Sequence, residues 1–107
     1  MIKGNAIFNE ALLSGTKTTT VRLRENRYYP GEIHAWINPD HPSLPIAWVK
    51  IIRVSEARLR YINPIREGFS CKEAMLDFLQ RAYQIFTLDF SDIMQLVEFE
   101  LTEAPND

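Results

Sequence analysis

The chain has 107 residues, of which 46% are apolar and 11% aromatic, so we expect one globular domain with a core of ordinary size. Its formal net charge of −2 argues against a protein that holds nucleic acid through bulk charge. No apolar run approaches the roughly 18 residues of a membrane span, and the first residues do not look like a secretory signal. A single cysteine, Cys71, excludes an internal disulfide and fits a reducing compartment, so we expect a cytoplasmic protein with no membrane partner.

The first predicted elements are a short helix and a polar strand. Apolar residues recur at helical spacing over residues 6–14, and Gly15 would end the helix because glycine takes the left-handed conformation at no steric cost. Residues 18–24 then alternate as a strand does. One face would carry Thr18, Thr20, Arg22 and Arg24, and the other Thr19, Val21 and Leu23. Lys17 would lie at the corner where the strand begins.

Two further strands are predicted on either side of a loop. A turn at residues 28–31 leads into a predicted strand at residues 33–37. Residues 38–45 contain three prolines and should form a loop, because proline cannot donate to a strand ladder. Residues 46–54 are rich in β-branched side chains and predict a long strand, whereas residues 59–62 are ambiguous.

A second main helix and a closing strand complete the chain. Ser70-Cys71-Lys72-Glu73 matches a capping box with Ser70 as the N-cap, and the helix that follows should end near Tyr83. Residues 97–101 alternate between apolar and acidic side chains, which predicts a half-exposed strand. Since there is no regular β-α-β alternation, we expect a mixed α+β domain over residues 1–107, with a small curled sheet.

Several isolated features predict little chemistry. His34 and His41 lack the paired spacing of metal ligands, so no metal site is expected. Cys71 would lie at a helix N-terminus, where the dipole favours a thiolate, but a lone cysteine beside an apolar helix is most often a packed residue. Phe86 and Phe90 fit either the core or an oligomer contact.

Lys17, Thr20 and Arg22 form the strongest candidate site. A threonine hydroxyl needs a neighbouring base to act as a nucleophile, and a lysine held near other cations can have its pKa lowered enough to be that base. Arg22 could hold an anionic or carbonyl oxygen. The missing proton carrier could be Glu67, although spacing alone does not bring it to Thr20. The alternative is a polar corner that only stabilises the fold.

The pattern Gly15-x-Lys17-x-x-Thr20-x-Arg22 resembles the signature of the ASCH domain, which has a PUA-like fold. Three further segments are similar to that family's leading helix, to the acidic-Gly-Phe start of its second helix and to its last strand: Ala11-Leu12-Leu13-Ser14, Glu67-Gly68-Phe69-Ser70 and Val97-Glu98-Phe99. The resemblance covers about residues 7–101. It implies an α+β fold in which a small curled β-barrel carries two main helices.

The resemblance also implies a hydrolase. Small bacterial ASCH proteins that look most like this chain include N4-acetylcytidine amidohydrolases, which release cytidine and acetate without a metal or other cofactor. Carried over by position, Lys17 is the base, Thr20 the nucleophile and Glu67 the general acid/base. The nucleoside would be held by Arg22, Arg24 and Tyr28.

Other ASCH domains are thought to bind or cleave RNA, which is the alternative for this chain. Phosphates would then be held by Lys17, Arg22, Arg24 and Arg27, and bases would stack on Tyr28, Tyr29 or Trp36. The net charge of −2 suits a small neutral substrate better than a polyanion, so the hydrolase is the leading hypothesis.

Overall fold

The structure, a computed structural model, describes residues 1–105. In chain order its elements are β1 (Ile2–Lys3), a 3-10 turn (Ala6–Phe8), α1 (Asn9–Leu13), β2 (Thr19–Arg22), β3 (Ile33–Ile37), β4 (Ala47–Arg58), a second 3-10 turn (Leu59–Tyr61), α2 (Pro64–Glu67), α3 (Lys72–Tyr83) and β5 (Ile93–Thr102). Within residues 1–105, no helix has both the length and the apolar character needed to cross a bilayer.

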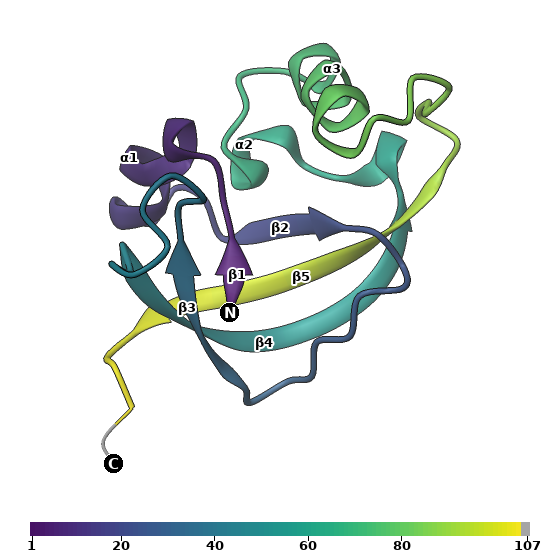
Figure 1. The fold of residues 1–107 in the computed structure, drawn as a ribbon. Helices are drawn as coiled ribbons and strands as arrows, with labels where there is room; N and C mark the ends of the chain where they lie inside the picture. Colours follow the sequence, from purple (N-terminus) through teal and green to yellow (C-terminus); the bar gives the residue numbers. More distant parts are fainter. Residues whose placement is uncertain (106–107) are drawn as a thin grey trace.

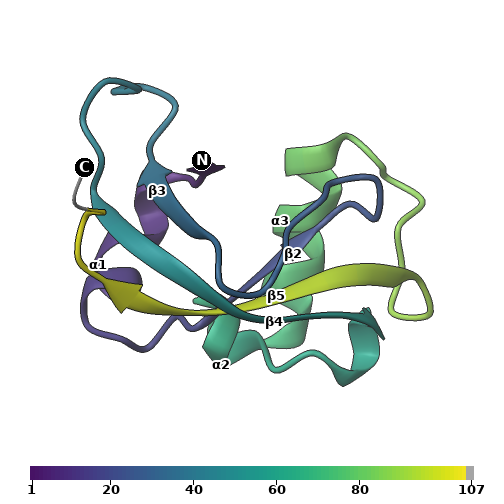
Figure 2. The ribbon, with the colours of Figure 1, turned by 90° about the horizontal axis from the view of Figure 1, so that it is seen from below.

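The five strands form one sheet in the order β1-β3-β4-β5-β2. β1 pairs with β3 in parallel, and every other pairing is antiparallel. β4 and β5 form the long central ladder, and a register shift between Ile51 and Arg53 marks an irregularity in it. Figures 1 and 2 show that these two strands bend strongly, so the sheet curls into a half-barrel with the helices on its inner side.

The core has two parts, one under each group of helices. α3 packs on one part through Met75 and Leu79, together with Val21 of β2 and Met94 of β5. α1 packs on the other through Leu12, which meets Ile2, Trp36, Val49 and Phe99. Each of these helices buries one apolar stripe on the sheet. The polar corner between α1 and β2 lies between the two parts of the core.

Most predicted elements are present, with different ends. The helix expected over residues 6–14 is the 3-10 turn followed by α1, and Gly15 has φ +83°. The strand expected over residues 18–24 is shorter, because the chain turns after Arg22 and the Asn26 amide donates to the Leu23 carbonyl. β4 runs on to Arg58, and β5 begins at Ile93, so both strands are longer than predicted.

The N-cap of α3 was predicted wrongly. Cys71, in an extended conformation, occupies that position rather than Ser70, and its side chain makes no capping hydrogen bond. β1 and α2 were not predicted because they have only two and four residues. The start of α2 follows ordinary capping rules, since the Asn63 side chain accepts from the Ile65 amide and Pro64 is the first helical residue.

Candidate functional site

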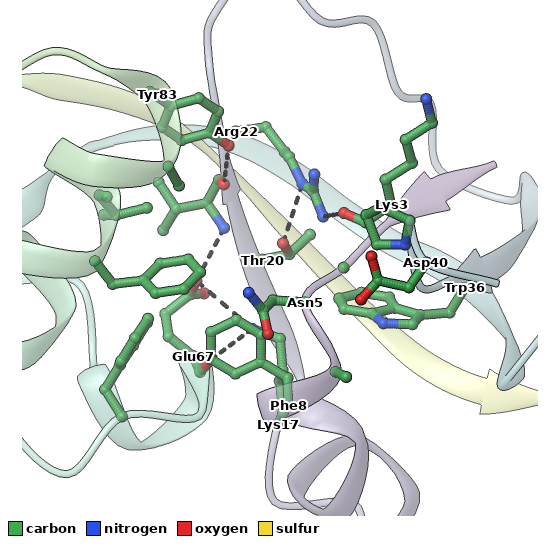
Figure 3. Close-up of a pocket in the computed structure, with 18 residues that line it drawn as sticks. Lys3, Asn5, Phe8, Lys17, Thr20, Arg22, Trp36, Asp40, Glu67 and Tyr83 are labelled. Atoms are coloured by element: carbon green, nitrogen blue, oxygen red, sulfur yellow. Dashed lines mark hydrogen bonds and ion pairs between the residues drawn. The ribbon is translucent and has the colours of Figure 1, made fainter. Parts of the chain in front are cut away.

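The polar corner opens into a cavity of about 430 Å³ between the sheet, α3 and the chain around β1 (Figure 3). Its polar and charged lining residues are Lys3, Asn5, Lys17, Thr20, Arg22, Asp40, Glu67 and Tyr83. Its aromatic lining also includes Phe8, Trp36, Phe69 and Phe78. A pocket of this size with a few converging polar groups suits a small-molecule ligand.

Lys17 is buried at this corner, with only 3% of its surface exposed. The chain turns inward after α1, where the Lys17 amide donates to the Ala11 carbonyl. The Lys17 amine donates to the carbonyl oxygens of Thr19 at 2.9 Å and Glu67 at 2.5 Å, and it lies 4.6 Å from the centre of the Phe8 ring. Burial lowers the Lys17 pKa from 10.5 to about 8; the Glu67 carboxylate opposes this change and the Arg22 guanidinium adds to it.

Glu67, the last residue of α2, places its carboxyl group at the same corner. Its carboxylate accepts hydrogen bonds from the Val21 amide, at 2.9 Å, and from the Thr19 hydroxyl. One carboxylate oxygen lies 3.9 Å from the Lys17 amine. Burial raises the Glu67 pKa above its usual value, and the charge of Lys17 and the two hydrogen bonds only partly oppose that effect. The carboxyl group therefore holds a proton to higher pH than an exposed glutamate does.

Thr20 and Arg22 point the same way from β2, as their spacing predicts. The Arg22 Nε donates to the Thr20 hydroxyl oxygen at 3.1 Å, and another guanidinium nitrogen donates to the Lys3 carbonyl at 3.0 Å. Both side chains line the cavity with Lys17 and Glu67. Within residues 1–105, however, the Thr20 hydroxyl makes no direct hydrogen bond with Lys17 or Glu67, and Arg22 is its one hydrogen-bonded neighbour.

Two residues that support this site were not singled out from the sequence. Thr19 binds the Glu67 carboxylate through its hydroxyl, and strand alternation had already placed Thr19 on the inner face with Val21. Tyr83, near the end of α3, donates from its hydroxyl to the Val21 carbonyl at 2.8 Å, and burial raises its pKa. The amide and the carbonyl of Val21, on the edge of β2 away from β5, are thus both bound by side chains, which holds the strand that carries Thr20.

Arg24 and Tyr28 lie away from the cavity, because β2 ends at Arg22 and the chain turns. Arg24 faces Glu56 at 3.4 Å, and Tyr28 packs edge-on against His34. These two residues belong instead to a second, smaller cavity of about 210 Å³, lined by Arg24, Asn26, Arg27, Tyr28, Tyr29 and Gln95. The structure therefore brings together Lys17, Thr20, Arg22 and Glu67 but not the whole predicted set.

The side chains that could bind a metal ion do not form a cluster in the described residues. In the part of the chain that the structure describes, no three His, Cys, Asp or Glu side chains lie close enough to hold a metal ion. His34 contacts Glu32 at 3.2 Å and the N-terminal amine at 3.0 Å. Cys71 is exposed. Of the two phenylalanines left unassigned, Phe86 is exposed and Phe90 packs partly on the core.

Solved structures with the same fold include ASCH domains. An ASCH domain of Lactobacillus crispatus JV V101 matches with a TM-score of 0.69 and 19% identity, over 89% of this chain and 70% of that one. A protein of Enterococcus faecalis V583 matches with a TM-score of 0.70 and 18% identity, over 92% and 68%. A mutant ASCH protein of Zymomonas mobilis matches with a TM-score of 0.64 and 11% identity, over 92% and 66%.

No protein-family model matches the chain. Nor does any curated protein. The structural matches establish the fold, an α+β half-barrel of the PUA-like kind with two groups of helices, and thereby confirm the fold class that the sequence predicts.

Proposed function

We propose that this chain, which has the fold of ASCH domains, hydrolyses the amide of an N4-acylated cytidine-type nucleoside, such as N4-acetylcytidine to cytidine and acetate. One observation carries the proposal. A buried lysine with a pKa of about 8, a buried carboxyl group with a raised pKa and a threonine hydroxyl line one cavity. Groups whose pKa values lie nearer neutrality than usual are suited to proton transfer.

Thr20 is the proposed nucleophile and Lys17 its base. A neutral lysine amine has two N–H bonds and one lone pair, and the carbonyls of Thr19 and Glu67 can take both N–H bonds. The lone pair is then left to accept the Thr20 proton. A change of the Thr20 rotamer or a small shift of the amine must first bring these two atoms within hydrogen-bond reach.

The bond changes are those of an acyl transfer through a covalent ester. The Thr20 oxygen forms a bond with the acetyl carbon as Lys17 takes the hydroxyl proton, and Arg22 stabilises the charge on the carbonyl oxygen. The carbon–nitrogen bond then breaks, and the protonated Glu67 carboxyl delivers a proton to the leaving nitrogen. A water molecule then attacks the acetyl-Thr20 ester and gives a proton to Glu67. The bond between the acetyl carbon and the Thr20 oxygen breaks, and Lys17 returns its proton to that oxygen, which releases acetic acid, ionised to acetate in solution, and restores all three groups.

The test is incubation of the purified protein with N4-acetylcytidine while the release of cytidine is followed. Lys17→Ala and Thr20→Val should each lower kcat/KM by about 10²-fold or more. The matched control is Thr16→Val, which removes an exposed hydroxyl from the same segment and should leave kcat/KM unchanged. Absence of turnover by the unaltered protein, or full turnover by Thr20→Val, would contradict the proposal.

Thr19→Val separates the nucleophile from its neighbour. Thr19 binds the Glu67 carboxylate, so its loss should weaken proton delivery without removing the attacking group. We therefore expect a smaller fall in kcat/KM than with Thr20→Val. A larger fall with Thr19→Val would instead assign the nucleophile to Thr19.

A second candidate, an RNA-binding or RNA-cleaving module, is favoured by the smaller cavity. Two arginines and two tyrosines, Arg24, Arg27, Tyr28 and Tyr29, line it together, and such groups bind phosphates and stack on bases. Affinity for a single-stranded RNA should then fall as salt rises and fall further in Arg24→Gln with Arg27→Gln. Absent or salt-independent binding would exclude this candidate.

A further inference from the structure

The loop at residues 38–45 carries a charged group into the main cavity. At its base Asn38 is buried, and its side chain donates to the Gly4 carbonyl at 2.8 Å and exchanges hydrogen bonds with the Asn9 side chain. The His41 amide then donates to the Asn38 carbonyl at 3.0 Å, which closes a tight turn with Pro39 and Asp40 at its two central positions. The backbone that carries Asp40 is therefore held by this turn.

Asp40 is exposed to solvent and lines the cavity from its open side. Figure 3 shows its carboxylate above the Trp36 ring, on the side of the cavity away from Glu67 and Tyr83. Within residues 1–105 the Asp40 side chain makes no hydrogen bond or ion pair, and the neighbouring Arg22 donates instead to Thr20 and the Lys3 carbonyl. An ionised carboxylate only accepts hydrogen bonds, so a ligand that replaces the water around it must supply donors.

The rest of the proposed nucleoside has donors of this kind. The amide to be cleaved must lie near Thr20 and Lys17, which leaves the far end of the ligand for another wall of the cavity. Two neighbouring hydroxyls on a ribose can both donate to one carboxylate, and acidic side chains bind ribose hydroxyls in this way in nucleotide-binding proteins. A phosphate placed on Asp40 itself would be repelled by the like charge, so the cations of the cavity, Lys3 and Arg22, would have to hold it elsewhere.

We infer that Asp40 is a specificity residue that binds the ribose hydroxyls and selects an unphosphorylated ribonucleoside. This inference rests on the proposed function, and it narrows the substrate to free nucleosides. A nucleotide inside an RNA strand has its 3′ oxygen tied to phosphate, so it cannot offer both hydroxyls. The same residue therefore disfavours polymeric RNA at this cavity.

Binding of cytidine, the nucleoside product, tests the role of Asp40 without turnover. Calorimetry should show that the unaltered protein binds cytidine at least about tenfold more tightly than 2′-deoxycytidine or cytidine 3′-monophosphate. Asp40→Ala should bring cytidine down to the affinity of 2′-deoxycytidine and should relieve the discrimination against the 3′-phosphate. The control is Asp77→Asn on the exposed face of α3, which should preserve all three affinities.

The kinetic comparison uses N4-acetylcytidine and its 2′-deoxy analogue. In the unaltered protein kcat/KM should favour the ribonucleoside by a similar factor, and Asp40→Ala should abolish that preference. Equal preference in both proteins, or no preference in either measurement, would overturn the role of Asp40 even if both substrates are hydrolysed. Ribose-dependent cytidine binding with no hydrolysis would support Asp40 as a ribose ligand and contradict the proposed reaction. Failure of the unaltered protein to bind cytidine would overturn the inference.

Discussion

Lys17 lies where a charged amine is costly and a neutral one is well accommodated. Burial acts against the ammonium form, and the Glu67 carboxylate, 3.9 Å away, supports it only in part. We predict that the Lys17 side-chain nitrogen titrates with a midpoint of about 8 and that Glu67→Gln moves the midpoint lower, because that change removes the nearby negative charge. Side-chain NMR of labelled lysine measures both midpoints, and Lys17→Arg assigns the signal. A midpoint near the ordinary 10.5 would contradict the expected effect of burial.

The short helix α2 presents Glu67 because it ends at a glycine in the left-handed conformation. Gly68 has φ +95°, and an added Cβ there would lie 2.9 Å from the Phe8 ring. Gly15 has a similar φ of +83°, but a Cβ there would meet nothing within 4 Å. The two sites form a matched pair that separates backbone strain from steric clash.

Gly68→Ala should therefore destabilise the protein more than Gly15→Ala. We expect about 1–2 kcal/mol for the left-handed conformation at either site, and an additional cost at Gly68 because the Phe8 ring must move. Urea denaturation of both variants gives the two free energies of unfolding. Equal losses would mean that the Phe8 ring yields freely, and the contact would then contribute nothing to the shape of the site.

The helix α3 is tied to the edge strand β2 by the Tyr83 hydroxyl. Because Tyr83→Phe removes one hydrogen bond to the Val21 carbonyl, it should lower the free energy of unfolding by about 1 kcal/mol. For a domain of this size the melting temperature should fall by several degrees, roughly 4–8 °C. Tyr61→Phe is the control, since Tyr61 is 77% exposed, and it should leave the melting temperature unchanged. If both variants melt alike, the Tyr83 bond does not stabilise β2.

At the scale of the whole molecule, local sequence patterns predicted the helices and strands better than the contacts between them. The two-residue period of a strand placed Thr20 and Arg22 on one face, and the structure agrees. The bond between Thr19 and Glu67 spans 48 residues, and that between Val21 and Tyr83 spans 62, so no local pattern could reveal either. Glu67 was one candidate from the sequence, and only the family resemblance placed it at the site. Arg24 was misplaced because alternation does not indicate where a strand ends.

The buried pair should also make the stability of the whole molecule depend on pH. The Glu67 pKa is higher in the folded state, so the folded protein binds more protons above pH 4.5 and the free energy of unfolding falls until pH exceeds that raised pKa. The Lys17 pKa is lower in the folded state, so the unfolded chain binds more protons between pH 8 and 10.5 and the free energy rises there. The full lysine effect amounts to about 3 kcal/mol.

Glu67→Gln should remove the fall on the acid side. A glutamine can keep the hydrogen bonds to the Val21 amide and the Thr19 hydroxyl without burying a carboxylate, but it also removes the negative charge that faces the Lys17 ammonium. The variant should therefore be more stable than the unaltered protein above pH 8, where Lys17 is neutral. Urea denaturation from pH 5 to 9.5 measures this difference below the range in which Tyr83 titrates. The exposed Glu73→Gln should leave the pH profile unchanged. A variant that is less stable at every pH would mean that the ionised carboxylate stabilises the fold, and the burial cost assigned to Glu67 would be wrong.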